Sequence, residues 1–248
     1  MTKTVNICTT SPGVPFLDAI AERWLRMYGP DPLTIASGLV LTPTRRSARA
    51  LAEAFLRVSG GTGLLLPRIV AFGAIGETPL ILRGTVTLPQ AVDPFRRLAV
   101  LTNLILRMKG VGGAPRTADR AWPLAVELAL LIDEADRAEI SLATRLPDAA
   151  DPGFAQHWAR TLEFLAIVTH AWPTWLAENG LVNPAARQVA LLNALARECE
   201  STSLAEPVLF AGVTSTFPSF VRLARVVARA SNGCIIVPML DMEMSDEA

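Results

Sequence analysis

The first 26 residues already restrict the fold, because they order a strand, a loop and a helix within a short span. Residues 5–10 are a short apolar run typical of a buried strand, and residues 16–26 have helical spacing. The order repeats with a strand predicted at residues 38–41 and a helix at residues 45–58. A repeated alternation of apolar strand and helix favours an α/β fold with a parallel sheet flanked by helices.

The loop between the first strand and the first helix lacks the residues that a phosphate-binding loop requires. Such a loop needs several glycines, whose N–H groups converge on phosphate, and a Lys followed by Ser or Thr. Here Pro12 and Pro15 each remove an N–H, and no lysine is present. The strand predicted at residues 208–211 ends in Ala and Gly where a working site would place a Mg²⁺-binding Asp.

We therefore predict a degenerate nucleotide site that neither binds ATP tightly nor hydrolyses it, with no catalytic residue, metal ligand or cofactor. This prediction, and any lineage or role inferred from it, requires the strands at residues 5–10 and 208–211 to be neighbours in one sheet. The residues of the degenerate site are Ser11, Pro12, Gly13, Ala211 and Gly212.

Between about residues 88 and 199 the pattern changes to helices only, with candidates at residues 94–109, 118–139, 154–178 and 184–200. The alternation of strand and helix then resumes, with strands predicted at residues 208–211 and 235–237 and a helix at residues 218–230. We predict an incomplete α/β core domain formed by residues 1–87 and 201–248. An all-helical subdomain at residues 88–200 is inserted into it.

Composition excludes several classes of protein. Hydrophobic residues make up 51% of the 248, which excludes a disordered chain. Charged residues or prolines interrupt every apolar stretch before the roughly 20 residues of a membrane span, and the first residues lack a signal-peptide core. We expect a cytoplasmic protein with no membrane partner. Cys8, Cys199 and Cys234 lack the spacing of a zinc site or a disulfide framework, and unpaired thiols are expected.

The zero net charge conceals an asymmetry. Residues 43–120 carry twelve Arg or Lys against four Asp or Glu, and residues 121–248 carry eight against sixteen. Nucleic acid is one partner that fits such a distribution, and mutual pairing of the two halves is the other explanation.

The strongest functional candidate is the arginine-rich helix start at residues 44–49. Thr44 is suited to cap the helix, whose free N–H groups favour a phosphate. Arg45, Arg46 and Arg49 add permanently charged donors suited to bidentate phosphate contacts. We predict that Thr44, Arg45, Arg46 and Arg49 contact DNA, against the alternatives of a solvated helix start or an intersubunit salt-bridge surface.

Other motifs favour structural interpretations. The acidic run at residues 131–136 spells a helicase Mg²⁺ site, but the spacing around it is helical, and we predict a solvated helix face. We expect four tryptophans in the core, namely Trp122, Trp158, Trp172 and Trp175. We expect His157 and His170 at the surface. Ser11, Ser215 and Ser219 lack the sequence context of a hydrolase nucleophile, so a hydrolase is disfavoured.

Several segments, in order and at plausible spacing, resemble the N-terminal region of AddB. AddB is a subunit of the bacterial AddAB helicase-nuclease, which processes double-strand DNA breaks, and the likeness is to the form typical of alphaproteobacteria. The segments are residues 12–17, 41–51, 64–69, 157–158, 162–165, 172–173 and 181–187.

The resemblance implies a RecA-type, helicase-like first core domain with a helical insertion. Family members are several times longer and end in a nuclease domain with an iron–sulfur cluster, so we interpret the chain as an N-terminal fragment to which nuclease activity is not transferred. In the helicases that this family resembles, the segment matching residues 44–49 touches single-stranded DNA.

We therefore predict a non-catalytic scaffold of a break-repair helicase-nuclease. Its partners would be DNA, as a single strand or a duplex end, and an AddA-type motor subunit. The alternative is a pure protein-protein interaction module without DNA contact. A Rossmann-type enzyme is disfavoured, because the glycine fingerprint of that fold is missing.

Overall fold

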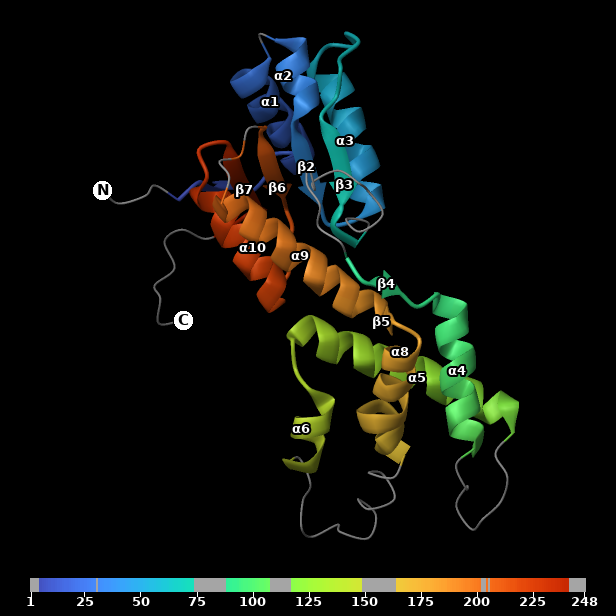
Figure 1. The fold of residues 1–248 in the computed structure, drawn as a ribbon. Coiled ribbons are helices and arrows are strands. Elements are labelled where there is room, and N and C mark those ends of the chain that lie inside the picture. Colours follow the sequence, from blue (N-terminus) through green and yellow to red (C-terminus); the bar gives the residue numbers. More distant parts are fainter. Residues whose placement is uncertain are drawn as a thin grey trace. The chain divides into compact units, whose positions relative to one another are not determined.

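The computed structural model describes residues 5–29, 31–73, 88–107, 117–148, 164–201, 204 and 206–240 (Figure 1). Two units pack around separate cores. The first contains Met1–Thr85, Leu192–Thr216 and Phe220–Ala248, and the second contains Val86–Leu191 with Phe217–Ser219. The second unit is therefore built mainly from one long segment between two parts of the first unit, together with the three residues Phe217–Ser219.

A five-stranded parallel sheet forms the first unit, which confirms the α/β class. The strands follow the order β1-β7-β6-β2-β3, and each neighbouring pair is parallel. Their bounds are β1 Ile7–Thr10, β2 Leu39–Thr42, β3 Arg68–Ala71, β6 Val208–Ala211 and β7 Gly233–Pro238.

The expectation that β1 and β6 are neighbours is wrong, because β7 lies between them. Ile235 of β7 is in register with Ile7 on one side and with Phe210 on the other. Ile235 and Ile236 point to opposite faces of the sheet, and both are buried. A strand that is apolar on both faces is stable only where helices cover both, as in the middle of a parallel sheet.

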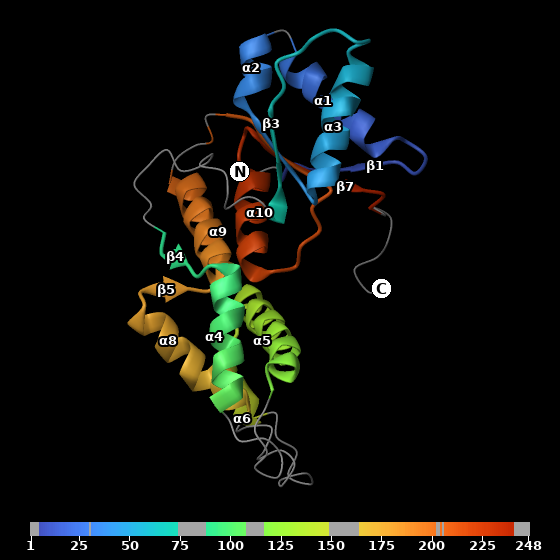
Figure 2. The same cartoon turned by 90° about the vertical axis from the view of Figure 1, so that its right-hand side faces the viewer.

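Helices cover both faces of this sheet (Figure 2). The crossover from β1 to β2 and the crossover from β6 to β7 run in opposite directions along the sheet. Right-handed crossovers then place their helices on opposite faces. The first face carries α1 (Phe16–Tyr28), α2 (Pro32–Ser37) and α3 (Arg45–Val58), and the second carries α10 (Pro218–Arg229).

The core under α1, α2 and α3 joins these helices to alternate residues of the central strands. Phe55 of α3 and Ile20 of α1 are fully buried there. On the other face, the rings of Phe210 and Phe220 stack with centroids 5.6 Å apart. The buried residues of the first core are Ile20, Ala21, Trp24, Ile35, Val40, Leu51, Ala54, Phe55, Leu209, Ala211 and Ile236.

Two local features of this unit are set by single side chains. The Asp31 side chain accepts hydrogen bonds from the N–H groups of Leu33 and Thr34 and so caps α2. On α3, Leu56 is 55% exposed, whereas Ala54 is fully buried.

The second unit is largely helical. Its described elements are α4 (Pro94–Arg107), α5 (Ala118–Ala138), α6 (Leu142–Asp148), the π-helix η4 (Ile167–Ala171), α8 (Trp172–Glu178) and the first part of α9 (Pro184–Ser201). The expectation of helices only is wrong here, since β4 (Gln90–Ala91) pairs in parallel with β5 (Leu181–Val182). Residues 154–163 of the expected third helix lie outside the described residues.

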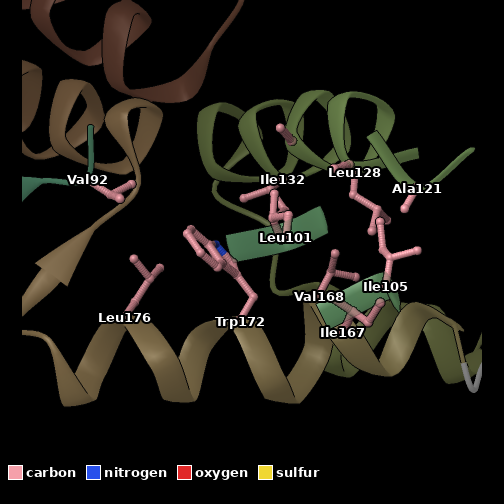
Figure 3. Close-up of a cluster of buried hydrophobic side chains, with 12 residues drawn as sticks. Val92, Leu101, Ile105, Ala121, Leu128, Ile132, Ile167, Val168, Trp172 and Leu176 are labelled. Atoms are coloured by element: carbon pink, nitrogen blue, oxygen red, sulfur yellow. The ribbon is translucent and has the colours of Figure 1, made fainter. Parts of the chain in front are cut away.

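A core of large apolar side chains joins α4, α5 and the η4–α8 segment (Figure 3). In the close-up, Ile167, Val168, Trp172 and Leu176 extend from one face of the η4–α8 segment toward Ile132 of α5. Trp172 is 1% exposed, which agrees with the core position expected for it.

The acidic run at residues 131–136 is helical, as expected, but its face is not fully solvated. Asp133 pairs with Arg97 of α4 at 2.8 Å, and the exposed fractions of the two side chains are 18% and 6%. A second Arg97 nitrogen donates to the Ala129 carbonyl at 2.8 Å. Glu134, in contrast, points outward and pairs with Arg137. Helical spacing predicts which positions share a face, and the partner helix decides which acid is covered.

Close packing at the start of β7 predicts a large effect of one methyl group. A Cβ added at Gly233 would overlap the backbone carbonyl of Val227, which cannot move without distorting α10. We expect Gly233→Ala to lower the free energy of unfolding by at least about 2 kcal/mol, measured by urea denaturation. In the matched control Gly63→Ala, the new Cβ has no neighbour within 4 Å, and a change below about 1 kcal/mol is expected. Equal stability of the two variants would contradict this packing.

The covered ion pair predicts different costs for two adjacent acids. Asp133→Ala leaves the buried Arg97 charge without its carboxylate. We therefore expect the free energy of unfolding of the helical unit to fall by about 3 kcal/mol. Glu134→Ala removes an exposed surface pair and should change stability by less than about 1 kcal/mol. Thermal and urea unfolding followed by circular dichroism measure both. A solvated Asp133 would make the two variants alike.

Candidate functional site

The loop after β1 is a tight turn and not a phosphate cradle. The Val14 N–H donates to the Ser11 carbonyl at 3.3 Å, and Gly13 has a φ of 85°. Pro12 in the second position and a positive φ in the third are the signature of a type II turn. The turn uses the Val14 N–H internally, and Pro12 and Pro15 have none to offer. Few backbone donors therefore remain for an anion.

The first turn of α1 carries its own negative charge. Asp18 is the third residue of the helix and pairs with Arg57 of α3 at 2.6 Å. A carboxylate at a helix N-terminus satisfies the partial positive charge that would otherwise attract a phosphate. Asp18 is not among the predicted site residues, although an acid three residues into a helix is a recognisable sequence signal of this arrangement.

The end of β6 is closed by apolar packing. Ala211 is 1% exposed, and the Gly212 N–H donates to the Ile236 carbonyl at 2.8 Å. A Cβ at position 212, where φ is 67°, would come within 2.9 Å of the Phe16 ring. The aromatic ring thus lies directly against the backbone at the point where a Mg²⁺-binding acid would begin, and no such side chain fits without moving it.

The residues of the degenerate site therefore share one edge of the sheet. Ser11, Pro12 and Gly13 follow β1, and Gly212 follows β6, with β7 between the two strands. The carboxyl ends of parallel strands are where α/β domains bind ligands. Here that edge is occupied by a proline turn, a neutralised helix start and a phenylalanine ring.

The arginine segment begins at the same edge, after β2. The Thr44 side chain accepts a hydrogen bond from the Ser47 N–H at 3.0 Å, so the expected helix cap is present. In contrast to α1, the first turn of α3 contains no acid. Arg45, Arg46 and Arg49 are exposed, and with Ala50 and Glu53 they line an open hollow of about 390 Å³.

Two of these arginines have no acidic partner in the described part of the chain. No ion pair within 4 Å joins Arg46 or Arg49 to a described carboxylate, although Glu53 lines the same hollow. Arg57, two turns further along α3, is paired with Asp18. Positive charge therefore concentrates at the start of α3, where the free N–H groups of the helix point.

The remaining candidates divide between core and surface. Trp172 and Trp175 stack with ring centroids 5.2 Å apart, whereas Trp122 is 37% exposed and lies against the more exposed Phe95. The core position expected for Trp122 is thus wrong, because its helix face turns partly to solvent. His170 is exposed as expected. Trp158 and His157 lie outside the described residues.

The three candidate serines and the three cysteines differ in burial. Ser219 is fully buried, Ser215 is half-buried, and Ser11 belongs to the proline turn. All three cysteines are free, as expected. Burial, followed by the nearby Cys8 thiol, raises the pKa of Cys234 to about 11, which keeps this thiol protonated and unreactive at neutral pH.

Searches for metal sites and membrane spans address the described residues only. Within them, no three His, Cys, Asp or Glu side chains gather as metal ligands. No helix in the same ranges combines the length and apolar character that crossing a bilayer demands.

Comparison with known proteins identifies no family: no protein-family model and no curated protein matches this sequence.

The closed edge of the sheet predicts that nucleotide does not bind. We expect no saturable heat when Mg-ATP is titrated into the protein up to millimolar concentration, because donors, cation and metal-binding acid are all missing. Isothermal titration calorimetry makes the measurement, with inorganic phosphate as a control for unspecific anion binding at the arginines. Micromolar affinity for Mg-ATP would contradict the degenerate-site interpretation.

Proposed function

We propose that this chain is a non-catalytic, helicase-like scaffold of a DNA-break repair helicase-nuclease, related to the N-terminal region of AddB. It engages DNA, as a single strand or duplex end, and docks an AddA-type motor subunit that supplies ATP-driven movement. Such a role places it in the cytoplasm. The sequence resemblance and the charge on one edge of the sheet support this proposal. The strand order does not support it, because β7 separates β1 from β6.

The observation that carries the proposal is the contrast between two helix starts on one edge of the sheet. The first turn of α1 contains Asp18, which pairs with Arg57, while the start of α3 combines Thr44, three exposed arginines and no first-turn acid. Free N–H groups and guanidinium groups together fit the phosphates of a nucleic-acid backbone. Contacts of this type position a strand without reading its sequence.

The edge strand β1 favours the interaction module as a second candidate. Among the described residues, β1 pairs only with β7. Ile7 of β1 is 47% exposed, and Val5, two residues before it, is 50% exposed. Met239 and Leu240 at the end of β7 are exposed as well. Exposed apolar groups beside a free strand edge are typical of a surface that docks a protein.

Charge reversal at the start of α3 tests DNA binding. We expect Arg46→Glu with Arg49→Glu to weaken binding to a single-stranded oligonucleotide. Each phosphate contact releases counterions, so the slope of log K against log salt should fall by roughly 1.4 for two lost contacts. Fluorescence anisotropy between 50 and 200 mM salt measures both quantities.

The matched control is Arg26→Glu with Arg229→Glu. These arginines are also exposed and lie on the same unit, but at the last turns of α1 and α10, and the change in net charge is the same. The control should retain the salt slope of the native protein. An equal loss of DNA affinity in both double variants would mean that the net charge of the protein, and not the start of α3, causes the effect. Undetectable DNA binding by the native chain, together with salt-resistant capture of the motor subunit, would favour the interaction module.

A further inference from the structure

The two outermost strands of the parallel sheet differ in how their outer sides are protected. Within the described residues, β3 pairs only with β2, and β1 pairs only with β7. The Arg68 N–H of β3 donates to the Gly38 carbonyl before β2, so the preceding Pro67 lies on the outer side, where it has no N–H to offer. The strand also begins with the charge of Arg68. Proline and charge at an outermost strand are common devices against pairing with another chain.

β1 has neither device. The carbonyls of Asn6 and Thr10 accept hydrogen bonds at 2.9 and 3.2 Å from N–H groups in and directly after β7, so both carbonyls face β7. Backbone groups of successive strand residues point to alternate sides, and those of Val5, Ile7 and Thr9 therefore point away from β7. Three residues, none of them a proline, thus present N–H and C=O groups along the outer side of β1.

The outer side of β1 is also uncharged and partly apolar. Residues 5–14 contain no Asp, Glu, Lys or Arg. The half-exposed side chains of Val5 and Ile7 share one face of the sheet, because alternate residues of a strand do so. The exposed Leu240 lies next to Thr9, since its N–H donates to the Thr9 hydroxyl oxygen at 2.8 Å. Another strand beside β1 would pair the backbone groups and cover these side chains together.

β1 is held in its extended form by its own unit. The Asn6 side-chain amide donates to the carbonyls of Ala230 and Gly233, each at 3.1 Å. The Asn6 N–H donates to the Ala228 carbonyl at 2.7 Å. A strand that is already ordered loses little conformational entropy when a partner pairs with it.

The outer side of β1 is complementary to itself. Its three outward-pointing residues are centred on Ile7, so a twofold axis at Ile7, perpendicular to the sheet, places a second β1 antiparallel to the first. Ile7 then lies opposite its counterpart, and Val5 lies opposite Thr9. Residues that face each other in this way exchange both backbone hydrogen bonds. Because the segment is uncharged, the pairing brings no like charges together.

We propose that β1 forms the interface of a homodimer, in which the β1 strands of two copies pair antiparallel about Ile7 and join two sheets into one. Such an interface is isologous, the commonest kind in dimers. An uncharged surface has no charge pattern to select a different protein, whereas a second copy supplies the matching strand by symmetry. The homodimer needs neither DNA nor a motor subunit, so its failure leaves the proposed DNA binding at the start of α3 untouched.

Analytical ultracentrifugation of the native full chain tests the proposal, in the presence of a thiol reductant that excludes disulfide exchange. Because the paired stretch is short, we expect dissociation in the micromolar range. The mass should rise from the 26.6 kDa of one chain towards twice that value between about 1 and 100 µM protein. Salt should have little effect, since no ion pair is formed. Hydrogen exchange of the peptide that contains β1 should slow over the same range, because the N–H groups of Ile7 and Thr9 become bonded.

Two lysine variants identify the surface. Ile7→Lys places two ammonium groups opposite each other at the axis and should weaken association at least about tenfold. The matched control Leu33→Lys adds the same charge on α2, where the side chain is 72% exposed, and should dimerise like the native chain. A monomer at 100 µM, hydrogen exchange in β1 that is independent of concentration, or equal association of the two variants would overturn the proposal. The two measurements on native protein decide the question even if Ile7→Lys fails to fold.

Discussion

Parallel pairing of β7 with β1 on one side and β6 on the other is the interaction on which the first unit depends. It brings the last described strand into the middle of a sheet begun by the first. Because all five strands run in the same direction, their carboxyl ends meet at one edge. The loops after β1, β2 and β6, which are distant in sequence, are thereby gathered where a ligand of an α/β domain is normally bound.

Two parts of that edge differ in charge and packing. Around β1 and β6, the Phe16 ring lies against Gly212, and Asp18 neutralises its helix start with Arg57. Beside β2, the start of α3 keeps its positive charge, and Arg46 and Arg49 have no acidic partner in the described residues. Triphosphate binding requires donors, cation and metal at one point, whereas contact with a nucleic-acid backbone requires only an accessible cationic surface.

In the helical unit, acidic residues that are adjacent in sequence have different environments. Asp133 is covered with Arg97, whereas Glu134 faces solvent. Spacing along the sequence predicted the helix and its buried apolar positions, because a period of 3.6 residues depends on local geometry alone. It could not predict which acid meets an arginine, since Arg97 lies on another helix.

By itself, the sequence determined the fold class, the bounds of most helices and strands to within a few residues, the cap at Thr44 and the tight proline turn after the first strand. Each depends on neighbours along the chain: apolar periodicity, capping side chains, proline and glycine. Only the tertiary structure decided that β7 separates β1 from β6 and that Phe16 fills the space at Gly212. These depend on pairing between residues far apart in sequence, which the long-range packing of apolar surface selects and local pattern cannot encode.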